Sequence, residues 1–286
     1  MNGRILALKQ KVRPEILIIS LVLLGIYLPV FTELVSDWEK DPNYSHGFLV
    51  PLVSLFLLWK KRKELSQIQT KISPLGLGLI AGGLFLLLVG TAGAEYFTAR
   101  LSFVLLLFGL VWYFGGSQIA KKASVPIWYL VLAIPVPYVI YFAVAFPLQI
   151  WATKITAVLL HILGMPSIRQ GNVIHLPHYS LEVVEACSGL RSLVSMLALS
   201  GVYAYLTQKT TLKKLILFIS AVPIALVANI FRISMTALGA YLISPKMAED
   251  FLHELSGLVV FVVSFICLFI FGEILKRIGA KKPAQT

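Results

Sequence analysis

The chain has 286 residues, of which 58% are hydrophobic and only 13% are charged. Soluble domains carry about 25% charged residues, so this chain lacks the polar groups that would cover a water-facing surface. The composition argues against a soluble enzyme and against disorder, which requires low hydrophobicity and high charge. The net charge of +12 lies in short clusters between long apolar runs, and this pattern indicates membrane topology, not nucleic-acid binding.

Apolar runs long enough for membrane helices recur along the whole chain, since a span needs about 20 apolar residues. We predict eight spans, at 15–35, 47–59, 75–93, 99–115, 125–146, 187–206, 215–243 and 254–275. The second is short, and Pro135 and Pro137 interrupt the fifth. The expected fold is therefore all-α, a polytopic membrane helix bundle that forms a single domain over 1–286.

The longest region outside these spans covers about 147–186. Trp151, Lys154 and His161 interrupt the apolar run at 147–165, which favours a helix lying in the interface or re-entering the membrane. Residues 171–184 alternate loosely and contain turn residues, so we expect a small β-hairpin there.

The orientation follows from the basic residues. Most of the 25 Lys and Arg residues fall in one set of loops and in the two terminal segments. The positive-inside rule places both termini in the cytoplasm. Most of the 13 acidic residues and the region 147–186 then face outward, and because loops carry function more often than scaffolds do, the outer face is the expected working face.

Arg232 is the most unusual residue within a predicted span. Apolar sequence flanks it on both sides, and an arginine at the bilayer centre costs about 2.5–3.5 kcal/mol on insertion scales. Asn229 lies three residues earlier, on the same helix face. A functional site is favoured, and a purely structural arginine bound to a carbonyl or an acid is the alternative.

Cys187 opens the sixth span from the outside. A helix N-terminus stabilises a thiolate, and Arg191 lies one turn further on the same face, whereas Glu185 would oppose the thiolate if it were close. Cys267, the second of two cysteines, lies about 21 Å deeper than the start of its own span. It is expected in the core, too far from Cys187 for a disulfide.

His253 opens the eighth span, also from the outside. A nucleophile, a cation and a titratable base on three consecutive spans are the minimum for thiol acyl transfer. His175 and His178 could ligate zinc but do not complete a site, so we expect no metal and no cofactor. His46, in Tyr44-Ser45-His46-Gly47, also faces outward, and its spacing alone indicates a structural residue.

The sequence around Cys187, Arg232, His253 and His46 resembles that of the exosortase/archaeosortase family of integral-membrane sorting enzymes. The resemblance runs from Tyr44 to His253 and is strongest at 185–192. It implies a catalytic set of Cys187, Arg232 and His253. The supporting candidates are Arg191, Asn229, Ser188, Gly189, His46 and Glu185, and the active-site half is about 166–260.

What the resemblance implies is a cysteine peptidase or transpeptidase in the bacterial inner membrane, with its active site on the periplasmic side. Substrates of such enzymes are exported proteins with a C-terminal Pro-Glu-Pro-type motif, a transmembrane helix and a basic tail. The enzyme cuts near the motif and passes the protein to an acceptor, which could be a lipid, a glycan or water. Family members often accompany exopolysaccharide production.

Three other functions are compatible with the residues. A transporter for an anionic solute would explain Arg232, although no internal repeat is evident. A zinc-dependent membrane hydrolase would use His175, His178 and His253. A structural assembly factor would need none of these side chains.

Overall fold

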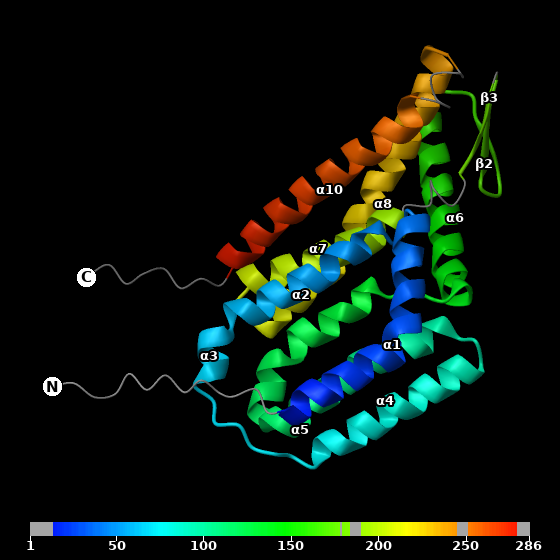
Figure 1. Ribbon diagram of the computed structural model, residues 1–286. Helices are drawn as coiled ribbons and strands as arrows, with labels where there is room; N and C mark the ends of the chain where they lie inside the picture. Colours follow the sequence, from blue (N-terminus) through cyan, green and yellow to red (C-terminus); the bar gives the residue numbers. More distant parts are fainter. Residues whose placement is uncertain (1–13, 178, 184–189, 245–250, 279–286) are drawn as a thin grey trace, which may run out of the picture. The chain divides into compact units, whose positions relative to one another are not determined.

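The computed structural model describes residues 14–177, 179–183, 190–244 and 251–278, with only the backbone at 14–17, 190–192, 251–256 and 258 (Figure 1). The protein is mostly helical. The elements are α1 (Pro14–Lys40), η1 (Ser45–Phe48), α2 (Leu49–Lys60), α3 (Arg62–Ser66), α4 (Leu75–Ala92), α5 (Tyr96–Tyr129), η2 (Leu130–Ala133), α6 (Tyr138–Ile162), β1 (Ile168–Gln170), β2 (Val173–Leu176), β3 (Tyr179–Glu182), α7 (Leu190–Thr207), α8 (Thr211–Leu242) and α10 (Phe251–Arg277).

Six helices in the described part of the chain are long and apolar enough to cross a membrane. They are Ile18–Lys40, Leu75–Ala92, Tyr96–Ala133, Tyr138–Ile162, Thr211–Leu242 and Val259–Arg277. The predicted spans at 47–59 and 187–206 correspond to shorter apolar helices, Ser45–Lys60 and Leu193–Thr207. The polytopic helical class is therefore confirmed, whereas the count of eight is not.

The prediction for 125–165 was wrong in its boundaries. No single helix covers 125–146. The helix α5 is kinked at Gly116, where φ is 81°, and its second part ends at Tyr129. The short helix η2 follows, and the chain is extended through 134–137 before α6 begins. Residues 147–162, expected as a helix in the interface or re-entering the membrane, are the second part of α6, a helix long and apolar enough to cross a membrane. Pro135 and Pro137 end the first helix because proline cannot donate a backbone hydrogen bond.

The polar residues of α6 explain why its sequence suggests an interfacial helix. Gln149, Thr153 and Thr156 are buried, while Val139 and Ile162 are more than three-quarters exposed. The polar face of α6 thus packs inward and its apolar face points outward, which suits a helix in lipid.

The expected hairpin is present and has a third strand. Strands β1, β2 and β3 form an antiparallel sheet in that order, with Gln170 paired to Val173 and Leu176 paired to Tyr179. Gly171 lies in the first turn with a φ of 62°, a conformation that glycine adopts without steric cost.

The chain divides into two compact units, one of 1–37 and 69–121 and one of 38–68 and 122–286. In the first unit, the core contains Tyr27 and Val30 of α1, Leu87 of α4, and Ala99 and Leu106 of α5. The Tyr27 hydroxyl lies 2.9 Å from Ser102 Oγ. Arg100, which is 5% exposed, forms an ion pair of 2.7 Å with Asp37.

Three glycines at seven-residue spacing bring α4 against α5. A Cβ on Gly76 would lie 2.5 Å from the Tyr113 backbone nitrogen, and one on Gly90 would lie 2.6 Å from that of Ala99. Gly83 makes the same kind of approach to Leu106. Small residues at such spacing let helix backbones approach closely in membranes.

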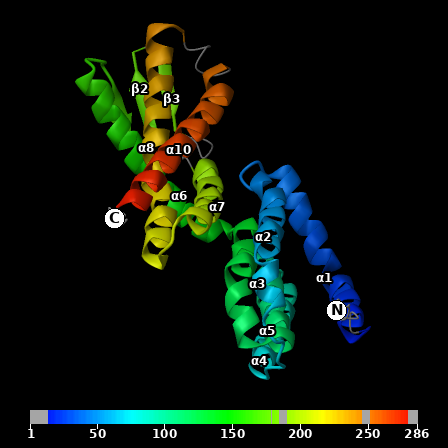
Figure 2. The same ribbon diagram turned by 90° about the vertical axis from the view of Figure 1, so that its left-hand side faces the viewer.

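In the second unit, α6 and α8 run in the same direction, side by side (Figure 2). Tyr141 and Ala145 pack in one cluster with Ala225, and Ala152 and Leu160 pack in another with the stretch of α8 from Ile230 to Ala240. This second cluster also contains buried residues of the sheet, so β2 and β3 lie against the C-terminal halves of α6 and α8.

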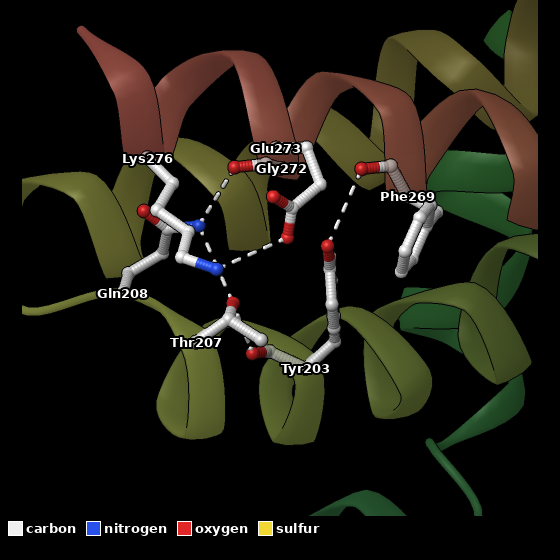
Figure 3. Close-up of polar contacts among 7 residues, drawn as sticks. All are labelled: Tyr203, Thr207, Gln208, Phe269, Gly272, Glu273 and Lys276. Atoms are coloured by element: carbon white, nitrogen blue, oxygen red, sulfur yellow. Dashed lines mark hydrogen bonds and ion pairs between the residues drawn. The ribbon is translucent and has the colours of Figure 1, made fainter.

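Polar contacts join the end of α7, and Gln208 directly after it, to the last part of α10 (Figure 3). Gln208 Nε2 donates to the Gly272 carbonyl at 2.9 Å, and the Tyr203 hydroxyl donates to the Phe269 carbonyl at 3.3 Å. A Cβ on Gly272 would meet the Tyr203 ring at 2.4 Å. The two helices are therefore held in one register at this end.

We predict that Gly76→Ala destabilises the protein by about 1–3 kcal/mol, because its Cβ would collide with backbone atoms of α5 that cannot rotate away. Thermal unfolding in detergent measures the effect. Gly78→Ala, on the same helix with nothing within 4 Å, is the control, and it should be neutral or stabilising by up to about 1 kcal/mol. Equal melting temperatures for the two variants would contradict this packing.

Candidate functional site

The described residues include part of the candidate catalytic set. Cys187, Glu185, Ser188 and Gly189 lie outside them. Arg191 lies in the first turn of α7 and His253 in the first turn of α10, each with only its backbone described. Arg232 and Asn229 are described fully.

Arg232 and Asn229 occupy adjacent turns of α8. The helix begins after Thr210, whose hydroxyl caps it by accepting from the Lys213 backbone N–H at 3.4 Å. It then continues for 32 residues, including Pro223. Asn229 is 1% exposed, and Arg232 is half-buried, between Ile230 and Ile233, which belong to the core cluster shared with the sheet. The arginine therefore lies beside this cluster, at the level of the sheet.

Val183 is the last described residue before the segment that contains Cys187. It is 1% exposed and packs in the same cluster as Ile230 and Ile233. Its backbone N–H donates to the Asn172 carbonyl at 2.9 Å, and its own carbonyl accepts from Asn172 Nδ2 at 3.3 Å and from Gln149 Nε2. The start of the cysteine segment is thus fixed next to the turns of α8 that flank Arg232.

The other end of this segment is the start of α7, which runs antiparallel to α8. Leu193 packs with Ala225, and Met196 and Ala204 pack with Leu217 and Ala221. Leu190 therefore begins α7 close to the level of Asn229. Both ends of the segment lie on the same part of α8.

An apolar groove of about 530 Å³ separates parts of α8 and α10. It is lined by Pro223, Ile224, Val227, Ala228, Phe231, Val259, Val260, Val263 and Cys267. Cys267 is exposed in this groove, so its expected place in the core was wrong. Pro223 of α8 lies in the same groove as Cys267 of α10. A thiol is apolar enough to face lipid at this position.

The groove also relates His253 to Arg232. Since α8 and α10 form an antiparallel hairpin, Phe231 and Val259 lie toward its connected end. Arg232 directly follows Phe231, whereas His253 lies six residues, about 9 Å, beyond Val259. The histidine backbone is therefore nearer the connection than that of Arg232.

His46 lies in η1 and contacts residues 130–137 between α5 and α6, which we call the interrupted helix. Its Nε2 lies 3.1 Å from the Leu132 carbonyl, and because a carbonyl only accepts, Nε2 carries the proton. Burial lowers the pKa of His46 below its usual 6.5, against smaller opposing effects of backbone hydrogen bonds with Leu132 and Asn43. His46 is therefore neutral at pH 7.

Neighbours of His46 bind the same interruption. Trp38 Nε1 donates to the Ala133 carbonyl at 2.8 Å, and the Val136 backbone N–H donates to the Tyr44 hydroxyl at 3.2 Å. A Cβ on Gly47 would overlap the Trp38 ring at 2.2 Å, so only glycine fits there. The 44–47 motif thus supports the start of α6.

The histidine pair of the zinc alternative is only partly described. His175, on β2, has its Nδ1 2.8 Å from Ser180 Oγ on β3, and His178 lies outside the described residues. The described residues hold no cluster of three or more His, Cys, Asp or Glu side chains that could bind a metal ion.

Comparison with protein families gives a match over 38–270 to the transmembrane exosortase family, described as transmembrane exosortase EpsH. The match covers most of the chain and begins at Trp38, where the support of the interrupted helix begins. The chain therefore belongs to the transmembrane exosortase family. No curated protein and no solved structure matches the chain at a significant level.

Sequence reasoning missed Gln149 and Trp38. Gln149 is the first polar residue after the apolar run that starts α6, a signal that could have marked it as an inward-facing group. A tryptophan near the end of a predicted span is typical of an interfacial anchor, and no sequence signal distinguishes such an indole from one that binds a backbone carbonyl, as Trp38 does.

We expect acidification below about pH 6.5 to destabilise the wild-type protein through His46. With its pKa lowered in the folded state, the unfolded chain binds the proton first, so this contribution to stability is lost as the pH falls. His46→Gln should be less stable at pH 7.5 and should lose less stability between pH 7 and pH 5. Melting temperatures across this range measure the difference, and parallel curves for both proteins would contradict it.

Proposed function

We propose that this exosortase-family membrane protein is a cysteine-dependent sorting peptidase or transpeptidase with Cys187 as nucleophile. The observation that carries the proposal is the position of Val183, buried in the same core cluster as Ile230 and Ile233, which lie on either side of Arg232 in α8. The family match supports the chemistry, and it does not favour a transporter or a zinc hydrolase.

Chain length limits how far Cys187 lies from these anchors. Cys187 follows Val183 by four residues and precedes Leu190 by three, and a chain spans at most about 3.6 Å per residue. Its Cα is therefore within about 14 Å of Val183 and about 11 Å of Leu190. A guanidinium on the long side chain of Arg232 is within reach of a thiol in that volume.

The proposed reaction is acyl transfer through a thioester. The Cys187 thiolate attacks a backbone carbonyl of the substrate, and Arg232 donates hydrogen bonds to the resulting oxyanion. The C–N bond then breaks, and the leaving amine takes a proton from His253. An acceptor that gives its proton to His253 attacks the thioester and releases the thiolate. Arg191 is the alternative oxyanion donor, one turn from Cys187.

The proposed substrates are exported proteins with a C-terminal Pro-Glu-Pro-type motif, a transmembrane helix and a basic tail, and the acceptor is a lipid, a glycan or water. The bias of Lys and Arg toward one set of loops supports cytoplasmic termini. In the bacterial inner membrane, the thiol would then face the periplasm. No nucleic acid takes part.

We expect Cys187→Ala to abolish processing of a secreted reporter that ends in such a three-part tail, because the thioester cannot form. Arg232→Ala should reduce the rate by about 10²–10³, the usual effect of losing an oxyanion donor. Co-expression, with gel mobility of the reporter as readout, measures both, and mass spectrometry of the shifted band identifies the acceptor.

Cys267→Ala is the matched control. Cys267 lies in the apolar groove on α10, and its replacement should leave the rate within about twofold of wild type. Reporter processing that persists in Cys187→Ala would refute the thiol mechanism. Absence of any shift over a panel of native tails would refute the sorting function.

A further inference from the structure

The carbonyl of Val183 is held by side-chain amides from two different elements. Asn172 Nδ2 donates from the turn between β1 and β2, and Gln149 Nε2 donates from α6. Both bonds end on the last described backbone oxygen before the segment that contains Cys187. This oxygen is therefore the point where helix, sheet and cysteine segment meet.

The bond to Asn172 continues the sheet. Val173 pairs with Glu182, so Asn172 and Val183 are the next pair, and the Val183 N–H donates to the Asn172 carbonyl as expected for it. This contact ties Val183 only to its own hairpin. The sheet itself packs on α6 and α8 through apolar side chains, so a directional polar link to the helices has to come from another group.

The bond from Gln149 supplies that link. Gln149 is 8% exposed, on a helix apolar enough to span a membrane. A buried amide in such surroundings is costly unless it is hydrogen-bonded. Thr153, one turn further, bonds to the Gln149 carbonyl within its own helix, whereas the Gln149 side chain reaches another element. Its bond therefore fixes the hairpin end to α6.

The level of Gln149 along the bundle suits this role. Ala145 packs with Ala225, and Ala152 packs with Ile230 and Ile233. Since α6 and α8 run in the same direction, Gln149 lies between these contacts, close to the level of Asn229 and less than one turn from that of Arg232. The amide thus joins the start of the cysteine segment to the part of α6 that lies near the level of Arg232.

We propose that Gln149 is a positioning residue for Cys187, which sets the start of the nucleophile segment relative to Arg232 by holding the Val183 carbonyl on α6. The inference rests on the proposed function of Cys187. Gln149 acts through the backbone carbonyl of Val183, from which the chain leads to Cys187. A displacement of about 1 Å can cost about 10²-fold in rate, so a single anchoring bond has a measurable effect.

Three variants test the proposal in the reporter assay, with purified protein for kinetics. Gln149→Leu keeps the size of the side chain and removes its donor, and kcat should fall about 10- to 100-fold with KM changed less than about threefold. Thr153→Val is the control, because it removes a buried hydroxyl from the same helix without touching Val183, and its rate should stay within about twofold.

Gln149→Glu gives a test that is independent of how much of each variant folds, because the activity of one protein sample is compared at different pH values. A protonated carboxyl can donate to the Val183 carbonyl, whereas a carboxylate cannot. The activity of this variant relative to wild type should therefore rise at least threefold as the pH is lowered from 8 to 6, and fall again on return. A ratio that is constant with pH would contradict the proposed donor role.

Alkylation of the thiol separates this inference from the proposed function. In a Cys267→Ala background Cys187 is the sole cysteine, so its rate of reaction with iodoacetamide can be followed against pH without substrate. Gln149→Leu should change that rate at least threefold or shift its pH midpoint, and Thr153→Val should do neither.

The outcomes are distinct. An altered alkylation profile in Gln149→Leu, with processing that persists in Cys187→Ala, would support the positioning of Cys187 and refute its role as nucleophile. Cysteine-dependent processing with unchanged kinetics and alkylation in Gln149→Leu would overturn the positioning role and leave the proposed function standing.

Discussion

The interrupted helix between α5 and α6 is the constraint on which the second unit depends. Proline removes backbone donors: Pro126 leaves the Lys122 carbonyl without its partner four residues on, and Pro137 does the same for Ala133. In a bilayer such carbonyl groups cannot form hydrogen bonds with water instead.

Side chains of the segment 38–61 bind these carbonyls. Lys61 Nζ donates to the Lys122 carbonyl at 2.6 Å, and Trp38 Nε1 donates to the Ala133 carbonyl. The carbonyl of Pro126 itself accepts from Ser54 at 2.8 Å. The segment 38–61 therefore binds the two carbonyls that Pro126 and Pro137 release, as well as the carbonyl of Pro126, which gives His46, Tyr44 and their neighbours a structural role.

The interruption at 130–137 lets α6 start in a new direction. The position of α6 then determines which side chains lie near the Val183 carbonyl and near the level of Arg232. Its inward face carries Gln149, Thr153 and Thr156, and its outward face is apolar. The same helix packs against α8 and the small sheet, so the Val183 carbonyl, the Gln149 amide and the α8 turns around Arg232 come together at one level. A charged side chain is costly in apolar surroundings, and buried polar side chains of α6 and α8, Gln149 and Asn229, lie close to the level of Arg232.

The other contacts of the bundle lie away from this level. Tyr203 and Gln208 form polar contacts with the last part of α10 (Figure 3). In the same region, the cluster around Leu217 and Leu268 packs α7, α8 and α10 together. The exposed Cys267 and its groove lie between that region and Arg232. The bundle therefore has apolar packing and polar contacts between α7, α8 and α10 at one end, and the buried polar side chains Gln149 and Asn229 at another level.

The sequence by itself determined the membrane class, a β-hairpin and the family, because hydropathy, turn residues and short motifs are local properties. Cys187, Arg232 and His253 could be selected as an unusual set from their types and order alone. Only the tertiary structure decided where α5 ends, that 147–162 belongs to a spanning helix, that Cys267 faces a groove, and that Gln149 bonds to the Val183 carbonyl. Local sequence could not decide these points, since a polar residue in an apolar run reads the same whether it faces water or a distant backbone oxygen. The partner of Gln149 is 34 residues away, and only packing brings such groups together.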